Sequence, residues 1–443
     1  MAHQRTALDW AEPLRAAILA LDMGLGKTPI AVRYVRDQAL GGALVVTPAG
    51  LRINWQREFD TFWPAHPPIQ VVTGTRDRIG AAPIVIVNYD LLPYPAIFEQ
   101  LKARRWPALI CDESQMANNL DSLRGAAILG RRGLAHSAER VLALSGTPAP
   151  NHVGELHAWL RIVAPDLLKA KGRWPDVTHH QDFLKQYLRY RPTRHGIQVL
   201  GSNNAQEFRE RFSPVILRMK KADVLHGLPP LRFAHVTLES DSLGDVLAYE
   251  KHPDFDGLRL VLENLDLDAP NAYDRLKSAL ERIELATLRR LVAVHKIAPV
   301  ADLVRQELGA GLEKVVIFGH HRELLDGLAE RLQDFKTVVV HGGVSPTARQ
   351  RAVDQFQSDP KCRVFVGQLD AAGVGYTLTA ASDVLLAESS WVPSKNKQAV
   401  DRVYRIGQSR PCLARFVSLA GSVDEIVMRV QARKLDALES LLL

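Results

Sequence analysis

Two closely spaced glycines precede a lysine and a threonine near the start of the chain, in the stretch Asp-Met-Gly-Leu-Gly-Lys-Thr at residues 22–28. Gly24 and Gly26 have no side chains, so backbone NH groups around them can converge on a phosphate chain. Lys27 would then reach the β- and γ-phosphates of a nucleotide, and the Thr28 hydroxyl would ligate Mg²⁺. Because the stretch follows an apolar run and opens a helical pattern, it favours an ATP-binding loop over a chance glycine turn.

A pair of carboxylates, Asp112 and Glu113, ends another apolar run about 85 residues after this loop. Asp112, at the end of a strand, could hold Mg²⁺ directly or through water. Glu113 could polarise an attacking water molecule. Acidic turns after strands are common, but the position of this pair within the same predicted sheet favours a catalytic interpretation.

Two arginines lie three residues apart near the C-terminus, at Arg402 and Arg405. On a helix both would face the same way. Such a pair could neutralise the charge of a γ-phosphoryl transition state, an effect of about 10³–10⁵ in rate where it has been measured. From spacing alone, a surface helix in which Asp401 forms a salt bridge is the better interpretation.

The elements that must position these residues are short apolar runs rich in Val, Ile and Leu that alternate with helical patterns. This alternation predicts parallel sheets covered by helices, an α/β fold. The predicted strands are residues 17–20, 43–47, 84–87, 108–111 and 141–144, and then 314–318, 337–340, 363–366, 384–386 and 414–417. Between the two sets, residues 150–225 look helical and irregular.

A break at residues 226–230, His-Gly-Leu-Pro-Pro, divides the chain into two predicted domains. The first, residues 1–226, carries a basic helical insertion at about 150–221. The second, residues 227–443, carries an acidic helical insertion at about 239–284. It closes with a helix at 423–438, whose apolar spacing predicts a brace against the lobe.

The composition is that of a folded soluble protein, with a net charge of +7 over 443 residues, 47% hydrophobic and 24% charged residues. The first residues contain no apolar signal core, and no apolar run is long enough to cross a bilayer. The three cysteines are far apart, which argues against a disulfide framework and a structural zinc site. We therefore expect a cytoplasmic protein that does not contact membranes.

Positive charge is concentrated in residues 169–221, which hold twelve Lys or Arg against four acids. Aromatic residues are interleaved with the bases, at Trp174, Phe183, Tyr187, Tyr190, Phe208 and Phe212. The segment as a whole favours a surface that faces nucleic-acid phosphates. For any single residue, a solvated base or a core aromatic is the better interpretation.

Eight segments, in order, resemble the motifs of the Swi/Snf group of superfamily-two helicase-like ATPases. They are residues 22–28, 46–59, 87–89, 112–115, 145–151, 316–321, 371–375 with 391–393, and 398–408. The last, which ends Arg-Ile-Gly-Gln, is especially specific. Within the group, the annealing-helicase branch (HepA-related proteins) is the most similar, on Glu388, His320-His321, Arg289-Arg290 and Lys296.

The resemblance implies two RecA-like lobes with ATP between them. Gln4 would read the adenine, and Met23 and Leu25 would line the nucleotide site with Gly373 and Gly375. The resemblance also implies that Arg402 and Arg405 are arginine fingers. The residues expected to contact DNA are Pro48, Asn54, Trp55, Asn88, Tyr89, His341, Gly342, Gln368 and Trp391.

Three departures from the family pattern affect these expectations. Gln115 replaces the histidine of the DEAH box, which leaves the coupling of hydrolysis to residues 145–148 open. Gln368 stands where many members have Ser or Thr. Leu21 and Asp22 replace the usual Asp-Glu pair.

The resemblance predicts an ATP-dependent translocase on double-stranded or branched DNA, with ATP and Mg²⁺ as cofactors. A strand-separating helicase or an RNA-directed ATPase is the alternative within the same chemistry. A nucleic-acid-binding module with a decayed ATP site is the non-enzymatic alternative. We expect a monomer, associated with the nucleoid if the source is prokaryotic or viral.

Overall fold

The computed structural model forms two compact units, Met1–Val224 and Leu225–Leu443, which are described separately. The structure describes residues 1–149, 152–193, 196–225, 227–240, 243–251, 285–369, 376–390 and 393–440. Three predicted site residues, Gly373, Gly375 and Trp391, lie outside the described residues, as does most of the acidic segment. No helix among the described residues is long and apolar enough to cross a membrane.

The first unit is built on a parallel sheet with the strand order β3-β4-β2-β5-β6-β1-β9. Its strands are β1 (Ala16–Leu21), β2 (Ala43–Thr47), β3 (Ile69–Val71), β4 (Ile84–Asn88), β5 (Trp106–Asp112), β6 (Ala138–Ser145) and β9 (Ile216–Met219). Strands β1, β2 and β4 are buried along their whole length, because helices cover both faces of the sheet.

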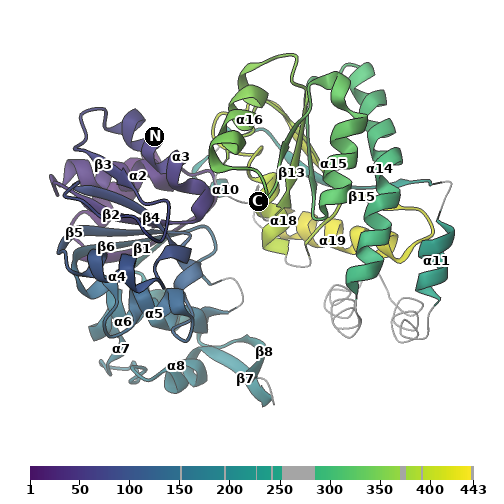
Figure 1. Cartoon of the computed structure of the whole chain (residues 1–443). Coiled ribbons are helices and arrows are strands. Elements are labelled where there is room, and N and C mark those ends of the chain that lie inside the picture. Colours follow the sequence, from purple (N-terminus) through teal and green to yellow (C-terminus); the bar gives the residue numbers. More distant parts are fainter. Residues whose placement is uncertain are drawn as a thin grey trace. The chain divides into compact units, whose positions relative to one another are not determined.

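The helices of this unit form two layers (Figure 1). Helices α2 (Lys27–Asp37) and α3 (Arg52–Phe62) cover one face, and α1 (Ala2–Ala11) packs beside α2. The other face is covered by α4 (Pro95–Lys102), α5 (Leu123–Leu129) and α6 (His157–Val163). This layering leaves the ends of the strands free to carry loops.

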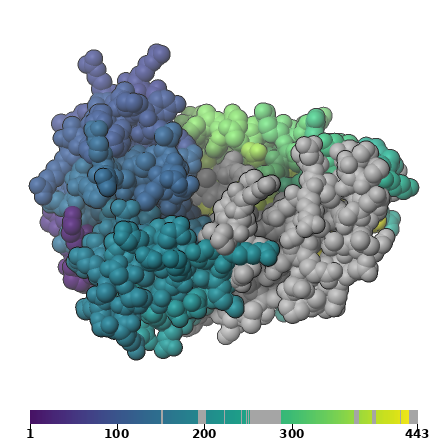
Figure 2. Space-filling view, turned by 90° about the horizontal axis from the view of Figure 1, so that it is seen from below, coloured from purple at the N-terminus to yellow at the C-terminus, as the bar shows by residue number. Residues whose placement is uncertain are grey.

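The basic segment is less helical than predicted. Its helices are α7 (Pro165–Leu168), α8 (His180–Tyr187), α9 (Ala205–Phe212) and α10 (Lys221–Val224). An antiparallel hairpin, β7 (Leu188–Thr193) and β8 (Gly196–Ser202), separates α8 from α9. Strand β9 then joins the main sheet beside β1. In Figure 2 the segment forms much of the teal surface of the first unit.

The second unit has a parallel sheet with the order β10-β15-β14-β11-β13-β12. Its strands are β10 (Leu231–Leu238), β11 (Val315–Gly319), β12 (Val338–Val340), β13 (Val364–Gln368), β14 (Asp383–Leu386) and β15 (Cys412–Leu419). Helices α14 (Leu285–Gly309) and α15 (Arg322–Arg331) contribute to the core on one face. Helices α16 (Pro346–Ser358), α18 (Pro393–Val400) and α19 (Val423–Ser440) contribute to the core on the other, and a short helix, α11 (Gly244–Glu250), packs on α14. Both units therefore confirm the predicted fold class.

Candidate functional site

The predicted phosphate loop connects β1 to α2, and its lysine side chain binds carbonyl groups at the start of the loop. Gly24 and Gly26 have φ angles of +84° and +79°, in the left-handed region that favours glycine. A Cβ atom on Gly26 would lie 2.3 Å from Nε2 of Gln4. The Lys27 ammonium donates to the carbonyl oxygens of Leu21 (2.8 Å) and Asp22 (3.3 Å). The loop thus has the glycines and the lysine that a phosphate chain requires.

Helix α1 packs against this loop through two side chains. Nε2 of Gln4 lies 3.5 Å from the carbonyl oxygen of Leu25, and Nε2 of His3 lies 3.0 Å from the same oxygen. Gln4, the residue expected to read adenine, therefore lies beside the loop. The contact from His3 had no signal in the sequence, because it depends on how α1 packs.

Asp112 ends β5 and is held by three donors. Its Oδ2 accepts from the Trp55 indole at 2.8 Å and from the Thr47 hydroxyl at 3.3 Å, and its Oδ1 accepts from the Glu113 NH at 3.0 Å. Burial and the neighbouring Glu113 charge raise the pKa of Asp112 to about 6, against the opposing effects of the Trp55 hydrogen bond and Lys27. The carboxylate is therefore fixed in orientation, and a nearby cation would favour its charged form.

Three residues predicted to contact DNA are buried in the first unit, and two of them contact Asp112. Trp55 and Tyr89 are fully buried, and the Tyr89 hydroxyl donates to the Asp112 carbonyl at 2.7 Å. Asn88 is also buried, and its Oδ1 lies 3.4 Å from an Arg52 nitrogen. The side chains of these three residues are therefore held inside the first unit, and contact of their segments with DNA stays a prediction.

Two other residues predicted to contact DNA, Pro48 and Asn54, are partly exposed. Pro48 follows β2 directly, and Asn54 lies in the first turn of α3. Because the carboxyl ends of parallel strands share one edge of the sheet, Pro48 lies at the same edge as the phosphate loop. Contact of Pro48 and Asn54 with DNA stays a prediction.

Glu113 adopts a left-handed conformation, with φ +49° and ψ +51°, which is uncommon for a residue with a side chain. Its Oε2 accepts from Nε2 of Gln115 at 2.7 Å. Oε1 of Gln115 accepts from the Ser145 hydroxyl at 2.6 Å, and the Ser145 oxygen accepts from the NH of Thr147 at 3.0 Å. These contacts form a relay from Glu113 to residues 145–147.

The amide of Gln115 suits this relay because it offers both a donor and an acceptor. A carboxylate only accepts hydrogen bonds, so the NH₂ group of Gln115 must face Glu113 and the oxygen must face Ser145. The replacement of the DEAH-box histidine therefore preserves a physical connection between the acidic pair and residues 145–148. The sequence alone left this point open.

The donor set fits Mg²⁺ held mainly by phosphate oxygens and water. Among the residues that the structure describes, no group of three or more His, Cys, Asp or Glu side chains could hold a metal ion. Mg²⁺ at nucleotide sites needs only one or two protein ligands, and Asp112 with Thr28 can supply them. Thr28 is in the first turn of α2, directly after Lys27.

In the second unit, three residues expected to contact DNA lie together at the carboxyl edge of the sheet. Oε1 of Gln368 accepts from the NH of Gly342 at 2.9 Å, and its Nε2 donates to the carbonyl of His320 at 3.1 Å. Nδ1 of His341 accepts from the NH of Gly343 at 3.0 Å. Gln368 thus connects the loops that follow β11 and β12, a role that Ser or Thr is too short to fill in the same way.

Among the residues that resemble the annealing-helicase branch, Glu388 and Lys296 are buried, whereas Arg290 is exposed. Glu388 accepts from the NH groups of His320 (2.6 Å) and His321 (2.8 Å), and it contacts Nδ1 of His321 at 2.6 Å. Burial alone would raise the pKa of Glu388, but its contacts with His321 and the NH group of His320 lower it to about 2. Lys296 is fully buried and pairs with Asp424 at 2.7 Å.

Arg402 and Arg405 do not share a helix face, which corrects the prediction from their spacing. Helix α18 ends at Val400, and the carbonyl of Arg402 accepts from the NH of Leu378 at 2.8 Å. Arg402 is buried, and a guanidinium nitrogen of Arg405 lies 3.4 Å from the carbonyl of Tyr376. Both arginines lie in a turn of the second unit.

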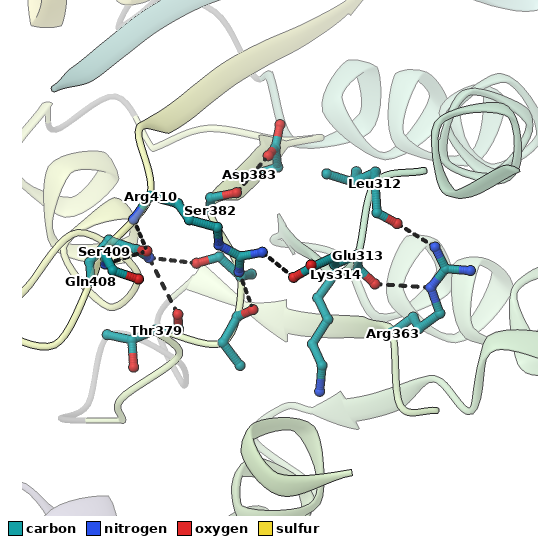
Figure 3. Close-up of polar contacts among 12 residues, drawn as sticks. Leu312, Glu313, Lys314, Arg363, Thr379, Ser382, Asp383, Gln408, Ser409 and Arg410 are labelled. Carbon is teal, nitrogen blue, oxygen red and sulfur yellow. Dashed lines mark hydrogen bonds and ion pairs between the residues drawn. The ribbon is translucent and has the colours of Figure 1, made fainter. Parts of the chain in front are cut away.

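Gln408 and Arg410 fasten this turn to the sheet (Figure 3). Nε2 of Gln408 donates to the carbonyl of Ala381 at 2.7 Å, and its Oε1 accepts from the NH of Arg410 at 3.0 Å. The Arg410 guanidinium donates to the carbonyl of Ala380 at 2.6 Å and pairs with Glu313, which precedes β11. The sequence motif that ends at Gln408 gave no sign of this structural role, because the role depends on residues distant in sequence.

Four aromatic residues of the basic segment pack together in the core of the first unit rather than forming a stacking surface. Phe183, Tyr187 and Phe212 are buried and pack on one another and on Phe208. Arg211 is fully buried and donates to the carbonyl of Leu167 at 2.6 Å. The interpretation of individual aromatics as core residues was correct for these side chains, and the phosphate-facing surface stays a prediction for the exposed bases.

A comparison with protein families decides the identity of the chain. The SNF2-related domain matches residues 3–252, and the helicase conserved C-terminal domain matches residues 296–407. The chain belongs to the SNF2-related family. The first match covers more than half of the sequence and contains the phosphate loop, the acidic pair and the Gln115 relay.

Curated relatives of this SNF2-related chain bear out its resemblance to the annealing-helicase branch. It is 28% identical to the DNA annealing helicase and endonuclease ZRANB3 of Homo sapiens, over 94% of this chain and 38% of the relative. It is 29% identical to the SWI/SNF-related matrix-associated actin-dependent regulator of chromatin subfamily A-like protein 1 of Xenopus tropicalis, over 99% of this chain and 44% of the relative. The SNF2-related chain thus spans less than half the length of these relatives.

Two solved structures are also similar to the SNF2-related chain at 22% identity. They are the SWI2/SNF2 ATPase core of Sulfolobus solfataricus in complex with dsDNA and the same core domain alone, with TM-scores of 0.44 and 0.43. The similarity covers 99% of this chain and 90% and 89% of those chains.

Proposed function

We propose that this SNF2-related chain is a DNA-dependent ATPase that translocates on double-stranded or branched DNA. The observation that carries the proposal is the relay from Glu113 through Gln115 to Ser145, at the same sheet edge as the Lys27 loop. A decayed ATP site would not need to hold an acidic side chain in a strained backbone conformation. The name of one relative, the DNA annealing helicase and endonuclease ZRANB3, supports DNA as the substrate class.

ATP would bind through the backbone NH groups of the loop at residues 24–26 and through Lys27, whose ammonium would exchange its carbonyl partners for phosphate oxygens. Thr28 and Asp112 would hold Mg²⁺, which neutralises phosphate charge when bound. Glu113 would orient the attacking water and accept its proton. Gln115 would keep Glu113 in place, and Gln4 would contact the adenine.

DNA would contact the partly exposed Pro48 and Asn54 in the first unit, and the loops of His341, Gly342 and Gln368 in the second. Contacts of this kind to the phosphate backbone give weak sequence preference and strong salt dependence. Arg402 and Arg405 would act as arginine fingers, as the resemblance implies.

An ATPase assay with blunt duplex, forked duplex, single-stranded DNA and RNA tests the proposal, together with displacement of a third strand from a triplex. We expect duplex or forked DNA to stimulate hydrolysis most and Lys27→Ala to abolish it. Stronger stimulation by single strands would favour a strand-separating helicase, and stronger stimulation by RNA would favour an RNA-directed ATPase. DNA binding without any hydrolysis would leave the binding-module alternative.

A further inference from the structure

A salt bridge joins the phosphate loop to the last strand of the first unit. Strand β9 lies beside β1 with Ala20 paired to Arg218. The Arg218 guanidinium donates to Oδ1 of Asp22 at 2.6 Å and to the carbonyl oxygens of Ala20 (2.8 Å) and Gly146 (3.3 Å). The second carboxylate oxygen of Asp22 accepts from the NH of Lys221 at 3.0 Å.

These contacts tie together three segments that the proposed mechanism treats separately. Asp22 begins the phosphate loop, Gly146 follows Ser145 of the relay, and Lys221 begins α10, the last helix of the first unit. The segment at Gly146 also packs directly on the loop, since a Cβ atom there would lie 3.0 Å from Cγ of Met23. One planar guanidinium group therefore fixes the spacing between loop and relay.

We propose that Asp22 and Arg218 are a pair of positioning residues that align the Glu113–Gln115–Ser145 relay with the phosphate loop. The inference rests on the proposed ATPase function, and it assigns the pair no contact with nucleotide or DNA. It gives a role to Asp22, which departs from the family pattern. It also links the loop to α10, whose chain leads directly into the second unit.

The activity test compares Arg218→Gln, Asp22→Asn, the double variant and Arg218→Lys in the full chain with stimulating DNA. Because the pair aligns groups without touching ATP, we expect kcat to fall about 10- to 100-fold in Arg218→Gln, while KM for ATP changes less than about threefold. The double variant should be no slower than the slower single variant. Arg218→Lys should be intermediate, because an ammonium keeps the charge but not the planar fork.

A matched control is Arg105→Gln, which removes an exposed ion pair with Glu139 (3.2 Å) at the opposite edge of the same sheet. It should leave kcat within about twofold of the unmodified protein. A kcat for Arg218→Gln as high as that of this control would overturn the positioning role.

Hydrogen exchange without nucleotide gives a readout that does not depend on catalysis. The NH of Asp22 donates to the Met219 carbonyl at 3.0 Å, and the NH of Lys221 donates to the Asp22 carboxylate. Both amides should exchange at least about tenfold faster in Arg218→Gln than in the unmodified protein. The amide of Val45 in β2 should be unchanged. If these two amides exchange faster but the unmodified protein hydrolyses no ATP, the contacts of the pair are supported and the proposed ATPase function is rejected. Unchanged exchange, or equal acceleration at Val45, would reject the pair.

Discussion

The carboxyl edges of the two sheets differ in the partners of their acidic and amide side chains. In the first unit these partners are mainly other side chains: Asp112 accepts from Trp55 and Thr47, and Gln115 bridges Glu113 and Ser145. In the second unit they are mainly backbone groups, although Glu388 also contacts Nδ1 of His321. Gln368 bonds to Gly342 and His320, and Glu388 accepts from two consecutive NH groups.

This difference suggests that the carboxyl edges of the two sheets have different functions. Side chains that hold other side chains fix individual reactive atoms, as a site of chemistry requires. Side chains that hold backbone fix the course of loops, as a surface that grips a polymer requires. Substitutions at the first edge should therefore reduce turnover, whereas those at the second should reduce stability or DNA affinity.

The sharpest test of the first edge is Glu113→Gln. It removes the acceptor for the proton of the attacking water while keeping the size of the side chain, so we expect kcat to fall about 10³-fold. Steady-state ATP hydrolysis with saturating duplex measures it. Glu99→Gln is the control, because Glu99 is exposed and forms only a 3.5 Å ion pair with Arg132. Equal activity of the two variants would contradict the assignment of Glu113.

The second edge should respond to pH through Glu388. Its pKa of about 2 in the folded state lies below its ordinary value of 4.5. The ionised form is therefore favoured by folding, so the stabilisation is complete above about pH 4.5 and is lost as the pH falls towards 2, by about 3 kcal/mol in total. Urea unfolding between pH 6 and pH 2 should show a shallower loss of unfolding free energy in Glu388→Gln. Parallel curves for the two proteins would refute this.

Substitutions of Gln115 test whether its hydrogen bonds with Glu113 and Ser145 are needed for turnover. Gln115→Leu keeps most of the volume but loses both hydrogen bonds, so kcat should fall about 10- to 100-fold. Gln115→His restores a ring with one donor and one acceptor and should lose less than about fivefold. Single-turnover ATP hydrolysis distinguishes them. If both variants lose activity equally, the relay does not act through these hydrogen bonds.

The smallest expected effect is on DNA affinity, from Gln368→Ala. Removing the bridge between two loops should weaken duplex binding about five- to tenfold, the equivalent of one or two net hydrogen bonds. Fluorescence anisotropy at fixed salt measures the Kd. Gln333→Ala, at an exposed position on the same unit, should bind as the unmodified protein does. Unaltered affinity in Gln368→Ala would place the DNA surface elsewhere.

The central strands were predictable because both of their faces are buried, so their sequences are continuous apolar runs. Strands β2, β4, β11 and β13 each lie within two residues of the predicted ranges. Three of the four edge strands, β3, β9 and β10, were not predicted, whereas the edge strand β12 lies within the predicted range 337–340. Strand β9 contains Arg218, and β10 alternates polar and apolar residues along a partly exposed edge.

The residues of the candidate site could be predicted only where a short, continuous segment of the sequence contains the reactive groups. Lys27, Asp112 and Glu113 follow from local spacing. That Trp55 and Tyr89 would hold Asp112 could not be foreseen, because it depends on the strand order β4-β2-β5 of the folded sheet. Similarly, local spacing could not show that the Arg402 carbonyl accepts from the NH of Leu378, a residue distant in sequence.

The backbone of Glu113 has a consequence for laboratory evolution. A left-handed conformation costs a residue such as glutamate about 1 kcal/mol or more, whereas asparagine tolerates it better. Glu113→Asn should therefore raise the melting temperature while removing the acidic group. Selection for thermal stability alone would therefore enrich inactive variants at this position. Selection for a more stable protein must include ATP hydrolysis as a second criterion.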